Sequence, residues 1–171
     1  AGRDWQRARW PPREHAAFEV LFYAKFSPLH GLPVILDAVE RLKAEPIRFT
    51  IVGGGQLEED VRRAVARSRS SALEWIPWLE RDALIERMQG CHLSLGIFGN
   101  TTKAGLVIPN KVFQALAMGV PVVTRDSPAI QELLEDAPSM FTCGPDGALL
   151  AAAILTCRRN FDAVKTVAQR G

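Results

Sequence analysis

Two lysines lie in and just after a loop that precedes a helix, and this position suits the binding of phosphate. Segment 96–124 has the pattern of a strand end, a loop, a helix and a following strand, with Lys103 in the loop and Lys111 where the helix begins. A helix start has backbone N–H groups without helical partners and carries the positive end of the helix dipole. Lysines beside it therefore predict a phosphate site.

Further candidate residues follow other predicted strands. Lys25 ends the first strand, and His30 and Gly31 open the next helix, so Lys25 and His30 could supply charge or hydrogen bonds to a diphosphate. Gly53 and Gly54 belong to a glycine triplet between a strand and a helix, where a backbone can approach a phosphate closely. Each has a structural alternative: a solvated lysine, a histidine that caps the turn, and a glycine-rich turn without a ligand.

Strands and helices alternate along the chain, and this order positions the candidates. The apolar patterns predict strands at 19–26, 47–52, 73–76, 92–98, 121–124 and 140–143, and helices at 32–43, 57–67, 82–88, 110–118, 129–134 and from about 147. Several strands are apolar on both faces, which is typical of a parallel sheet covered by helices on both sides. The prediction is an α/β fold, a single Rossmann-like doubly wound parallel sheet of about six strands.

In such a sheet, ligands bind at the carboxyl ends of the strands, near the point where the strand order reverses. The loops that hold the candidates should therefore meet at one crevice. Trp75 and Trp78, around the loop at 77–79, either flank a nucleotide base or pack against the core. Asp126 is expected to cap the following helix, and His92 to be structural.

Composition limits the classes of function. The chain of 171 residues is 47% hydrophobic and 23% charged, which fits one globular domain. Its net charge of +2, from 21 Lys and Arg against 19 Asp and Glu, predicts no nucleic-acid partner. The three cysteines lack metal-binding spacing, and no Asp-x-Asp or histidine cluster suggests a metal. No apolar run reaches the roughly 20 residues of a membrane-spanning helix.

The order of elements and several motifs resemble the C-terminal, donor-binding half of retaining glycosyltransferases with the GT-B fold, of the large family 4 (group 1). The resemblance covers about 20–155 and is most specific at 113–123, FQALAMGVPVV. Further similar stretches are Ala24-Lys25 with His30-Gly31, IVGGG at 51–55, EWIPW at 74–78, PLHG at 28–31, GIFG at 96–99 and VIPNK at 107–111.

This resemblance implies transfer of a sugar from a nucleotide-diphosphate sugar to an acceptor with retention, and without a metal cofactor. Basic side chains and helix-start N–H groups then stabilise the leaving diphosphate. None of the candidates is assigned as catalytic. The expected donor-binding residues are Lys25, His30, Gly31, Gly53, Gly54, Trp78, Thr102, Lys103, Asn110, Lys111 and Gln114.

Two positions depart from the family pattern. The paired glutamates of the family fall on Leu106 and Gln114; Gln114 can hydrogen-bond a hydroxyl group, but Leu106 cannot. Sugar recognition is then expected from Thr101, Thr102, Lys103 and Asn110. One alternative is a catalytically silent nucleotide-binding or scaffold module of the same fold. A nicotinamide-dependent oxidoreductase is a more distant alternative, because the glycine fingerprint is missing.

The resemblance also implies a second, N-terminal acceptor-binding domain that is missing from this chain. Residues 18–171 are then the donor-binding domain, and residues 1–17, rich in arginine, tryptophan and proline, are a connecting segment. The isolated chain is expected to bind nucleotide without turnover. The cysteine content favours a cytoplasmic location. The arginines at 62, 63, 67 and 69 are expected to form a solvated face, with contact to the inner face of a membrane as the alternative.

Overall fold

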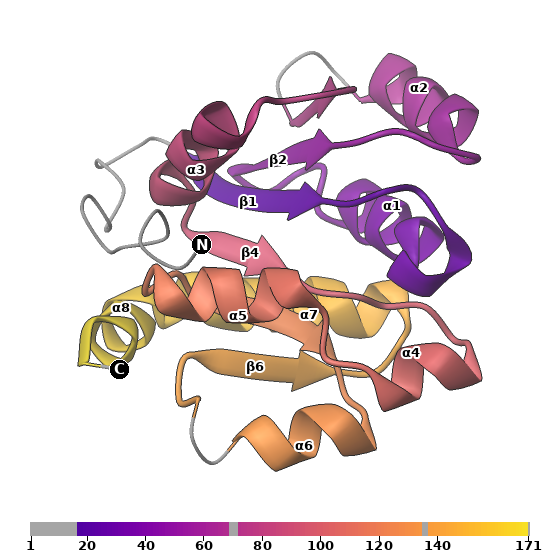
Figure 1. Ribbon diagram of the computed structural model, residues 1–171. Coiled ribbons are helices and arrows are strands. Elements are labelled where there is room, and N and C mark those ends of the chain that lie inside the picture. The colour runs from indigo at the N-terminus through magenta and orange to yellow at the C-terminus, as the bar shows by residue number, and fades with distance from the viewer. Residues whose placement is uncertain (1–16, 69–71, 135–136, 171) are drawn as a thin grey trace.

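The strands form one parallel sheet in the computed structural model, which describes residues 17–68, 72–134 and 137–170 (Figure 1). Over these residues the strand order is β3-β2-β1-β4-β5-β6, and every neighbouring pair is parallel. The predicted Rossmann-like sheet is therefore confirmed, with the order reversing between β1 and β4. The strands are β1 (Phe18–Tyr23), β2 (Ile47–Val52), β3 (Leu73–Ile76), β4 (Leu93–Leu95), β5 (Val122–Arg125) and β6 (Met140–Cys143).

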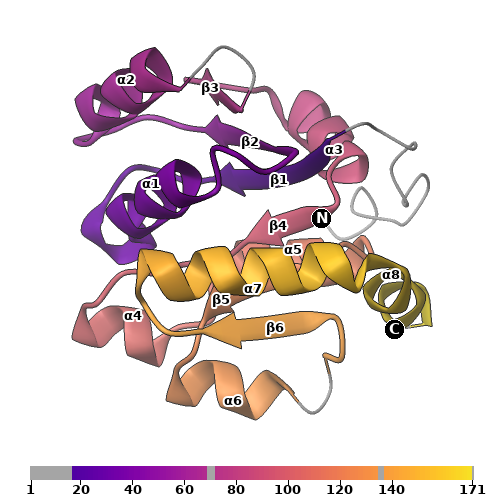
Figure 2. The ribbon, with the colours of Figure 1, turned by 180° about the vertical axis from the view of Figure 1, so that it is seen from behind.

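Helices cover both faces of the sheet. The helices are α1 (Leu32–Arg41), α2 (Glu58–Arg67), α3 (Arg81–Gly90), α4 (Thr102–Leu106), α5 (Asn110–Ala117), α6 (Pro128–Leu134), α7 (Gly147–Arg159) and α8 (Phe161–Arg170), with the short 3₁₀ helix η2 (Pro28–His30) before α1. Helices α1, α2 and α7 share one apolar cluster with the sheet, and α3, α5 and α6 share a second. The first group lies nearer the viewer in Figure 2, and α3 and α5 lie nearer in Figure 1.

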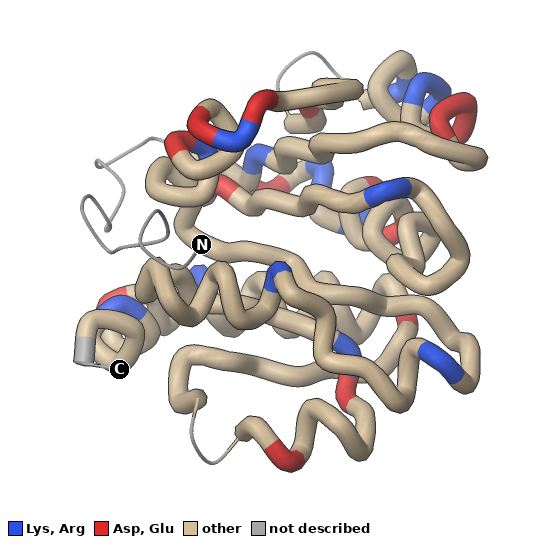
Figure 3. Tube along the Cα trace, viewed as in Figure 1, with Lys and Arg blue, Asp and Glu red and all other residues tan. Residues whose placement is uncertain are grey.

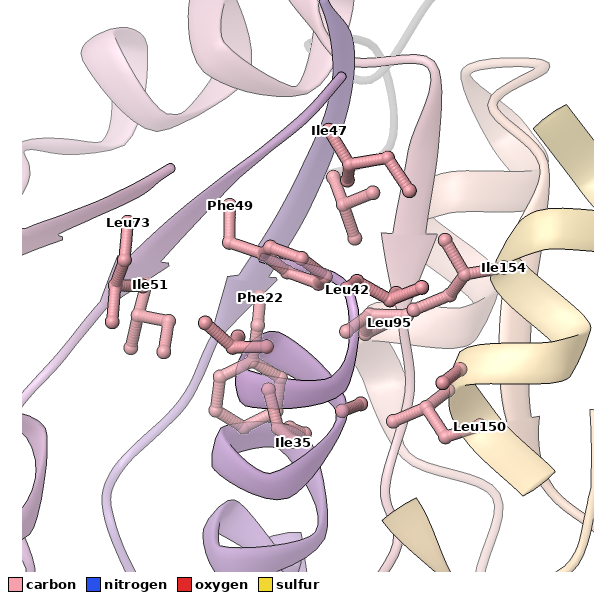
Figure 4. Close-up of a cluster of buried hydrophobic side chains, with 14 of the residues drawn as sticks. Phe22, Ile35, Leu42, Ile47, Phe49, Ile51, Leu73, Leu95, Leu150 and Ile154 are labelled. Atoms are coloured by element: carbon pink, nitrogen blue, oxygen red, sulfur yellow. The ribbon is translucent and has the colours of Figure 1, made fainter. Parts of the chain in front are cut away.

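The first cluster fixes α1 and α7 against the central strands. Phe22 of β1 and Phe49 of β2 are buried beside Ile35 of α1 and Leu150 and Ile154 of α7 (Figure 4). Burial of each such side chain stabilises the fold by about 1.5–3 kcal/mol. The loops that connect these elements at the carboxyl ends of the strands therefore start and end on rigid supports.

Two strands end earlier than the sequence predicts. β1 ends at Tyr23 and β4 at Leu95, whereas the apolar runs continue to 26 and 98. Phe26 instead forms an isolated parallel bridge with Gly55, and every residue from 91 to 99 is buried. An apolar run reports burial and not strand pairing, and here burial continues past the last paired residue.

The helices differ from the prediction at two places: α4 was not expected, and the helix expected from about 147 is divided into α7 and α8. α4 lies inside the segment that was expected to be a loop, and it is too short to give a helical period; Thr101 caps it by accepting a hydrogen bond from the backbone N–H of Ala104 at 3.1 Å. α8 follows α7 after Asn160, whose side-chain amide donates to the carbonyl oxygen of Thr156 at 2.9 Å.

The structural role predicted for His92 is confirmed. Its Nδ1 accepts a hydrogen bond from the backbone N–H of Glu19 at 2.9 Å, and its ring stacks on Phe18 with the ring centroids 4.9 Å apart. Residues 1–16, which make up most of the predicted connecting segment, lie outside the described residues, as does Arg69.

The arginines of α2 lie on a solvated, ion-paired face. Arg62 and Arg63 are exposed and pair with Glu59, at 2.5 and 3.5 Å. Acidic residues fill the first turn of this helix and basic residues follow them (Figure 3). No helix within the described ranges is both long and apolar enough to cross a membrane.

Candidate functional site at the carboxyl edge of the sheet

The loops after β1 and β4 are bonded together where the strand order reverses. The backbone N–H of Phe98 donates to the carbonyl oxygen of His30 at 3.1 Å, and that of Gly99 donates to Leu29 at 3.2 Å. From this point one chain segment enters α1 on one face of the sheet, and the other leads to α4 and α5 on the opposite face. The two loops therefore form a single rim at the place where open α/β sheets bind ligands.

Glycines allow this close approach of the two backbones. Gly31 has φ +66°, and a Cβ atom built on it would lie closer than 3.0 Å to the backbone of Phe98 and Gly99. A Cβ atom on Gly99 would meet the carbonyl oxygens of Pro28 and Leu29 equally closely. Only glycine fits both positions without moving the rim.

The glycine triplet after β2 packs against the loop after β1. A Cβ atom on Gly53, which has φ +136°, would overlap the carbonyl oxygen of Ala24. The N–H of Gly55 already donates to the Glu58 carboxylate at 2.9 Å, and Glu58, Glu59 and Asp60 fill the first turn of α2. Because these carboxylates already satisfy the start of α2, the structural explanation of Gly53 and Gly54 is the stronger one.

The start of α5 differs from that of α2. No acidic residue lies in its first turn, and its N-cap residue, Pro109, makes no side-chain cap hydrogen bond. A helix that begins at Asn110 leaves the N–H groups of its first residues without helical acceptors, although the ring of Pro109 removes one donor. Thr102, Lys103 and Asn110 are exposed nearby on α4 and α5. The start of α5, like that of α1 on the same rim, has no acidic residue and no side-chain cap and can receive an anion.

Lys111 is buried rather than presented on the surface. The residue is only 6% exposed, and its Nζ donates a hydrogen bond to the carbonyl oxygen of Gly96 at 3.1 Å. The same atom lies 4.1 Å from the ring centroid of Phe22 and 5.5 Å from that of Tyr23. Burial lowers the pKa of Lys111 from 10.5 to about 7. Lys111, predicted to bind phosphate at this helix start, is therefore an internal amine that titrates near neutral pH.

Lys25 and His30 lie on the β1 side of the rim. Lys25 is exposed, whereas His30 is half-buried with its Nδ1 2.9 Å from the hydroxyl oxygen of Ser27. Burial, together with the nearby charge of Lys111, lowers the pKa of His30 to about 4. At neutral pH His30 can therefore offer a hydrogen bond but no positive charge.

Gln114 and Trp78, two further predicted donor-binding residues, place a polar and an aromatic side chain at the carboxyl edge of the sheet. The hydroxyl of Tyr23 donates to Oε1 of Gln114 at 2.7 Å, and burial raises the pKa of this phenol, which stays neutral. Trp78 is 75% exposed, so it does not pack in the core. Trp75 does pack, with its indole N–H donating to the carbonyl oxygen of Gly53 at 2.9 Å. Of the two tryptophans, Trp78 is the one that can stack on a base.

Arg125 also belongs to this edge, and sequence reasoning missed it. Its guanidinium donates to the carbonyl oxygen of Gly99, and its buried Nε has no hydrogen-bond partner in the described structure. Arg125 thereby ties the end of β5 to the loop after β4. An arginine at the end of an otherwise apolar strand was the available signal, since that strand end lies on the ligand edge.

The predicted cap at Asp126 is wrong by one residue. The hydroxyl of Ser127 accepts the N–H of Ile130 at 3.3 Å, while Asp126 accepts the side-chain amide of Gln131 at 2.5 Å. Serine and aspartate cap equally well, so the sequence alone does not choose between adjacent residues.

Two hollows of the molecule lie away from the rim. A hollow of about 820 Å³ lies between α1 and α2, lined by residues that include Val39, Lys43 and Ala64, and one of about 190 Å³ lies beside β1, β2 and α3. Neither is lined by residues of the rim. Within the described ranges, no group of three or more His, Cys, Asp or Glu side chains could hold a metal ion.

This fold and rim define a doubly wound α/β domain with its ligand edge between β1 and β4. Residues 17–160 match the family described as Glycosyl transferases group 1, and the chain belongs to that family. It is 27% identical over 128 residues to the putative colanic acid biosynthesis glycosyl transferase WcaI of Escherichia coli K12, a match that spans 72% of this chain and 31% of WcaI.

A second relative is the chitobiosyldiphosphodolichol beta-mannosyltransferase of Candida albicans, which is 27% identical over 138 residues, covering 72% of this chain and 30% of that enzyme. The chain thus spans about a third of the length of these curated relatives.

Solved structures share the fold. Anabaena Alr3699/HepE, determined in complex with UDP-glucose, superposes with a TM-score of 0.72 at 20% identity, over 89% of this chain and 42% of HepE. The catalytic domain of the Helicobacter pylori cholesterol-alpha-glucosyltransferase gives a TM-score of 0.64 at 19% identity, over 90% of this chain and 94% of that chain. At this identity the likeness establishes the Rossmann-like architecture of GT-B glycosyltransferases.

Proposed function

We propose that this chain is the donor-binding part of a glycosyltransferase, and that it binds a nucleoside-diphosphate sugar on the rim between β1 and β4. The observation that carries the proposal is the start of α5. It has no acidic residue and no side-chain cap, and it follows the loop that is bonded to the loop after β1. The uncommitted N–H groups of a helix start favour phosphate, and the exposed Lys25 and Lys103 add positive charge.

The proposed chemistry is transfer of the sugar with retention, in which negative charge grows on the leaving diphosphate. Fixed N–H groups and lysines can stabilise that charge without reorganising, which lowers the barrier. Trp78 is proposed to stack on the base, and Gln114, through its amide, to bind a hydroxyl group of the donor. In this proposal no metal ion is required.

Turnover is proposed to need a second domain that carries the acceptor. The chain spans about a third of the length of its curated relatives. HepE, whose fold is similar, was determined with UDP and with UDP-glucose. We expect the isolated chain to bind a nucleoside diphosphate and to transfer no sugar. A cytoplasmic location, with contact at the inner face of a membrane as the alternative, remains part of the proposal.

A second candidate function rests on Leu106. This side chain is 70% exposed on α4, beside Lys103. An exposed leucine cannot hydrogen-bond a sugar hydroxyl, so a module that binds nucleotide without catalysis, or only serves as a scaffold, is the alternative.

Calorimetry with UDP, GDP and ADP tests the proposal. We expect at least one of them to bind the 171-residue chain with a Kd of about 1 mM or tighter. Lys25→Ala should weaken that nucleotide about tenfold, equivalent to about 1.4 kcal/mol, because it removes a charged phosphate partner. It should leave the weak binding of the corresponding nucleoside unchanged.

Lys43→Ala is the matched control, since Lys43 is equally exposed but follows α1 and pairs with Glu40 at 2.5 Å. It should bind nucleotide like the unmodified chain. Failure of all three nucleotides to bind at millimolar concentration would reject the donor-binding function and leave the scaffold.

A further inference from the structure

The side-chain nitrogen of Lys111 lies between β1 and β4, in the split beyond the last paired residues of these strands. The parallel pairing of β1 with β4 ends at Leu21 and Ser94. Beyond that pair the Nζ atom lies over the rings of Phe22 and Tyr23, 4.1 and 5.5 Å from their centroids. Lysine thus fills the gap that the reversal of strand order opens in the sheet.

This amine is poorly compensated as a cation. An ammonium group has three N–H donors, and the acceptor bonded to it in the described structure is the carbonyl oxygen of Gly96, at 3.1 Å. The two aromatic faces attract a desolvated cation by about 2 kcal/mol, but they carry no full negative charge. Charge on a buried amine with so few partners is unfavourable, in keeping with the lowering of its pKa to about 7.

The neighbouring groups supply no negative charge. From η2, His30 is neutral at pH 7, because its pKa is lowered to about 4 by burial and by Lys111 itself. From β1, the phenol of Tyr23 donates to Gln114 of α5 and stays protonated. The first turn of α5 contains no acidic residue. A counter-charge for Lys111 therefore has to come from a ligand.

We propose that a diphosphate bound at the start of α5 draws a proton from the solvent onto the neutral amine of Lys111. Binding then converts an uncharged amine into an ammonium group beneath the anion. This inference rests on the proposed function. Lys111 is the second residue of α5, so its backbone belongs to the helical turn whose N–H groups would bind the diphosphate, while its side chain reaches the carbonyl oxygen of Gly96. A nearby anion favours the charged form of an amine.

Calorimetry of UDP binding at pH 8 in HEPES and in Tris measures the coupling, because the two buffers release a proton with different enthalpies. The second ionisation of a phosphate lies near pH 6, so UDP itself contributes no proton at pH 8. We expect uptake of about 0.9 proton per UDP at pH 8 and of about half a proton at pH 7. Affinity should fall with rising pH by up to about tenfold per pH unit.

Two variants separate this coupling from simple phosphate binding. Lys111→Met keeps an apolar side chain of similar length in the split and should take up no proton. Lys25→Met should bind UDP about tenfold more weakly yet take up as many protons as the unmodified chain. Binding of UDP with no proton uptake would overturn the coupling and leave the proposed function intact. Binding of none of UDP, GDP and ADP would reject both.

A second measurement does not depend on a variant. The chain has five lysines, so ¹³Cε labelling of lysine gives few signals to follow against pH. Without ligand, the Lys111 signal should titrate near pH 7, and saturating UDP should move its midpoint upward by about three pH units, as uptake of about 0.9 proton at pH 8 requires. A midpoint above pH 10 without ligand, or one that UDP leaves unchanged, would contradict the proposal.

Discussion

Replacement of Gly31 by alanine is expected to destabilise the fold by about 2–5 kcal/mol, because two penalties combine at this position. Its φ of +66° disfavours any side chain. A Cβ atom would also lie closer than 3.0 Å to backbone atoms of Phe98 and Gly99, which cannot rotate away as a flexible side chain can. Urea unfolding of the variant and of the unmodified chain measures the difference.

Gly105→Ala is the control for this prediction. Gly105 lies in α4, and an added Cβ atom there meets nothing within 4 Å. Alanine should therefore stabilise the fold slightly, by up to about 1 kcal/mol, through its higher helix propensity. If the free energy of unfolding of Gly31→Ala lay within about 1 kcal/mol of that of the unmodified chain, the loops after β1 and β4 could not be in contact as described.

The sequence predicted the sheet well because parallel strands have a strong signature. The pairs Ile51-Val52 and Val122-Val123 put apolar side chains on both faces of their strands, and each strand is followed by a helix that has an apolar side. The order of the elements together with right-handed crossovers then leaves few arrangements of the strands. The ligand edge follows from the same topology, so the rim between β1 and β4 could be located before any side chain was placed.

Side-chain placement at the rim was less predictable. A lysine in a loop or at a helix start is usually solvated, and nothing local to Lys111 signals that it points into the split between β1 and β4. Its burial depends on Phe22, Tyr23 and Gly96, which lie far away in the sequence. Arg125 was missed for a related reason, because its partner, Gly99, belongs to a different strand loop.

The burial of Lys111 has an expected effect on stability as well as on binding. Its pKa falls from 10.5 to about 7 on folding, so between these values the unfolded chain holds a proton that the folded chain has released. Stability therefore rises with pH in this window, by up to about 1.4 kcal/mol per pH unit. The penalty for burying the charge is fully present below pH 7 and disappears as the pH approaches 10.5.

Lys111→Met should isolate this effect. The methionine variant is expected to be the more stable protein at pH 7, with an advantage that shrinks by about 1.5 kcal/mol by about pH 8.5, as the lysine of the unmodified chain loses its charge. Urea unfolding of both proteins across this range gives the difference. The lost hydrogen bond to the carbonyl oxygen of Gly96 offsets part of the advantage, but equally at every pH at which the amine donates to it.

The thiols of the three cysteines set the upper limit of the pH range in which the effect of Lys111 on stability is easily measured. Burial raises the pKa of Cys91 and Cys143 from 9.0 to about 12 and that of Cys157 to about 11, so their contribution to stability is present below pH 9 and is lost as the pH rises through these higher values. Because both proteins contain the same thiols, this opposing slope cancels in the difference. Lys43→Met replaces an exposed lysine and is the control for the substitution itself. A difference for Lys111→Met that does not change with pH would mean that the amine keeps its charge inside the fold, and that its place between β1 and β4 is better solvated than its contacts indicate.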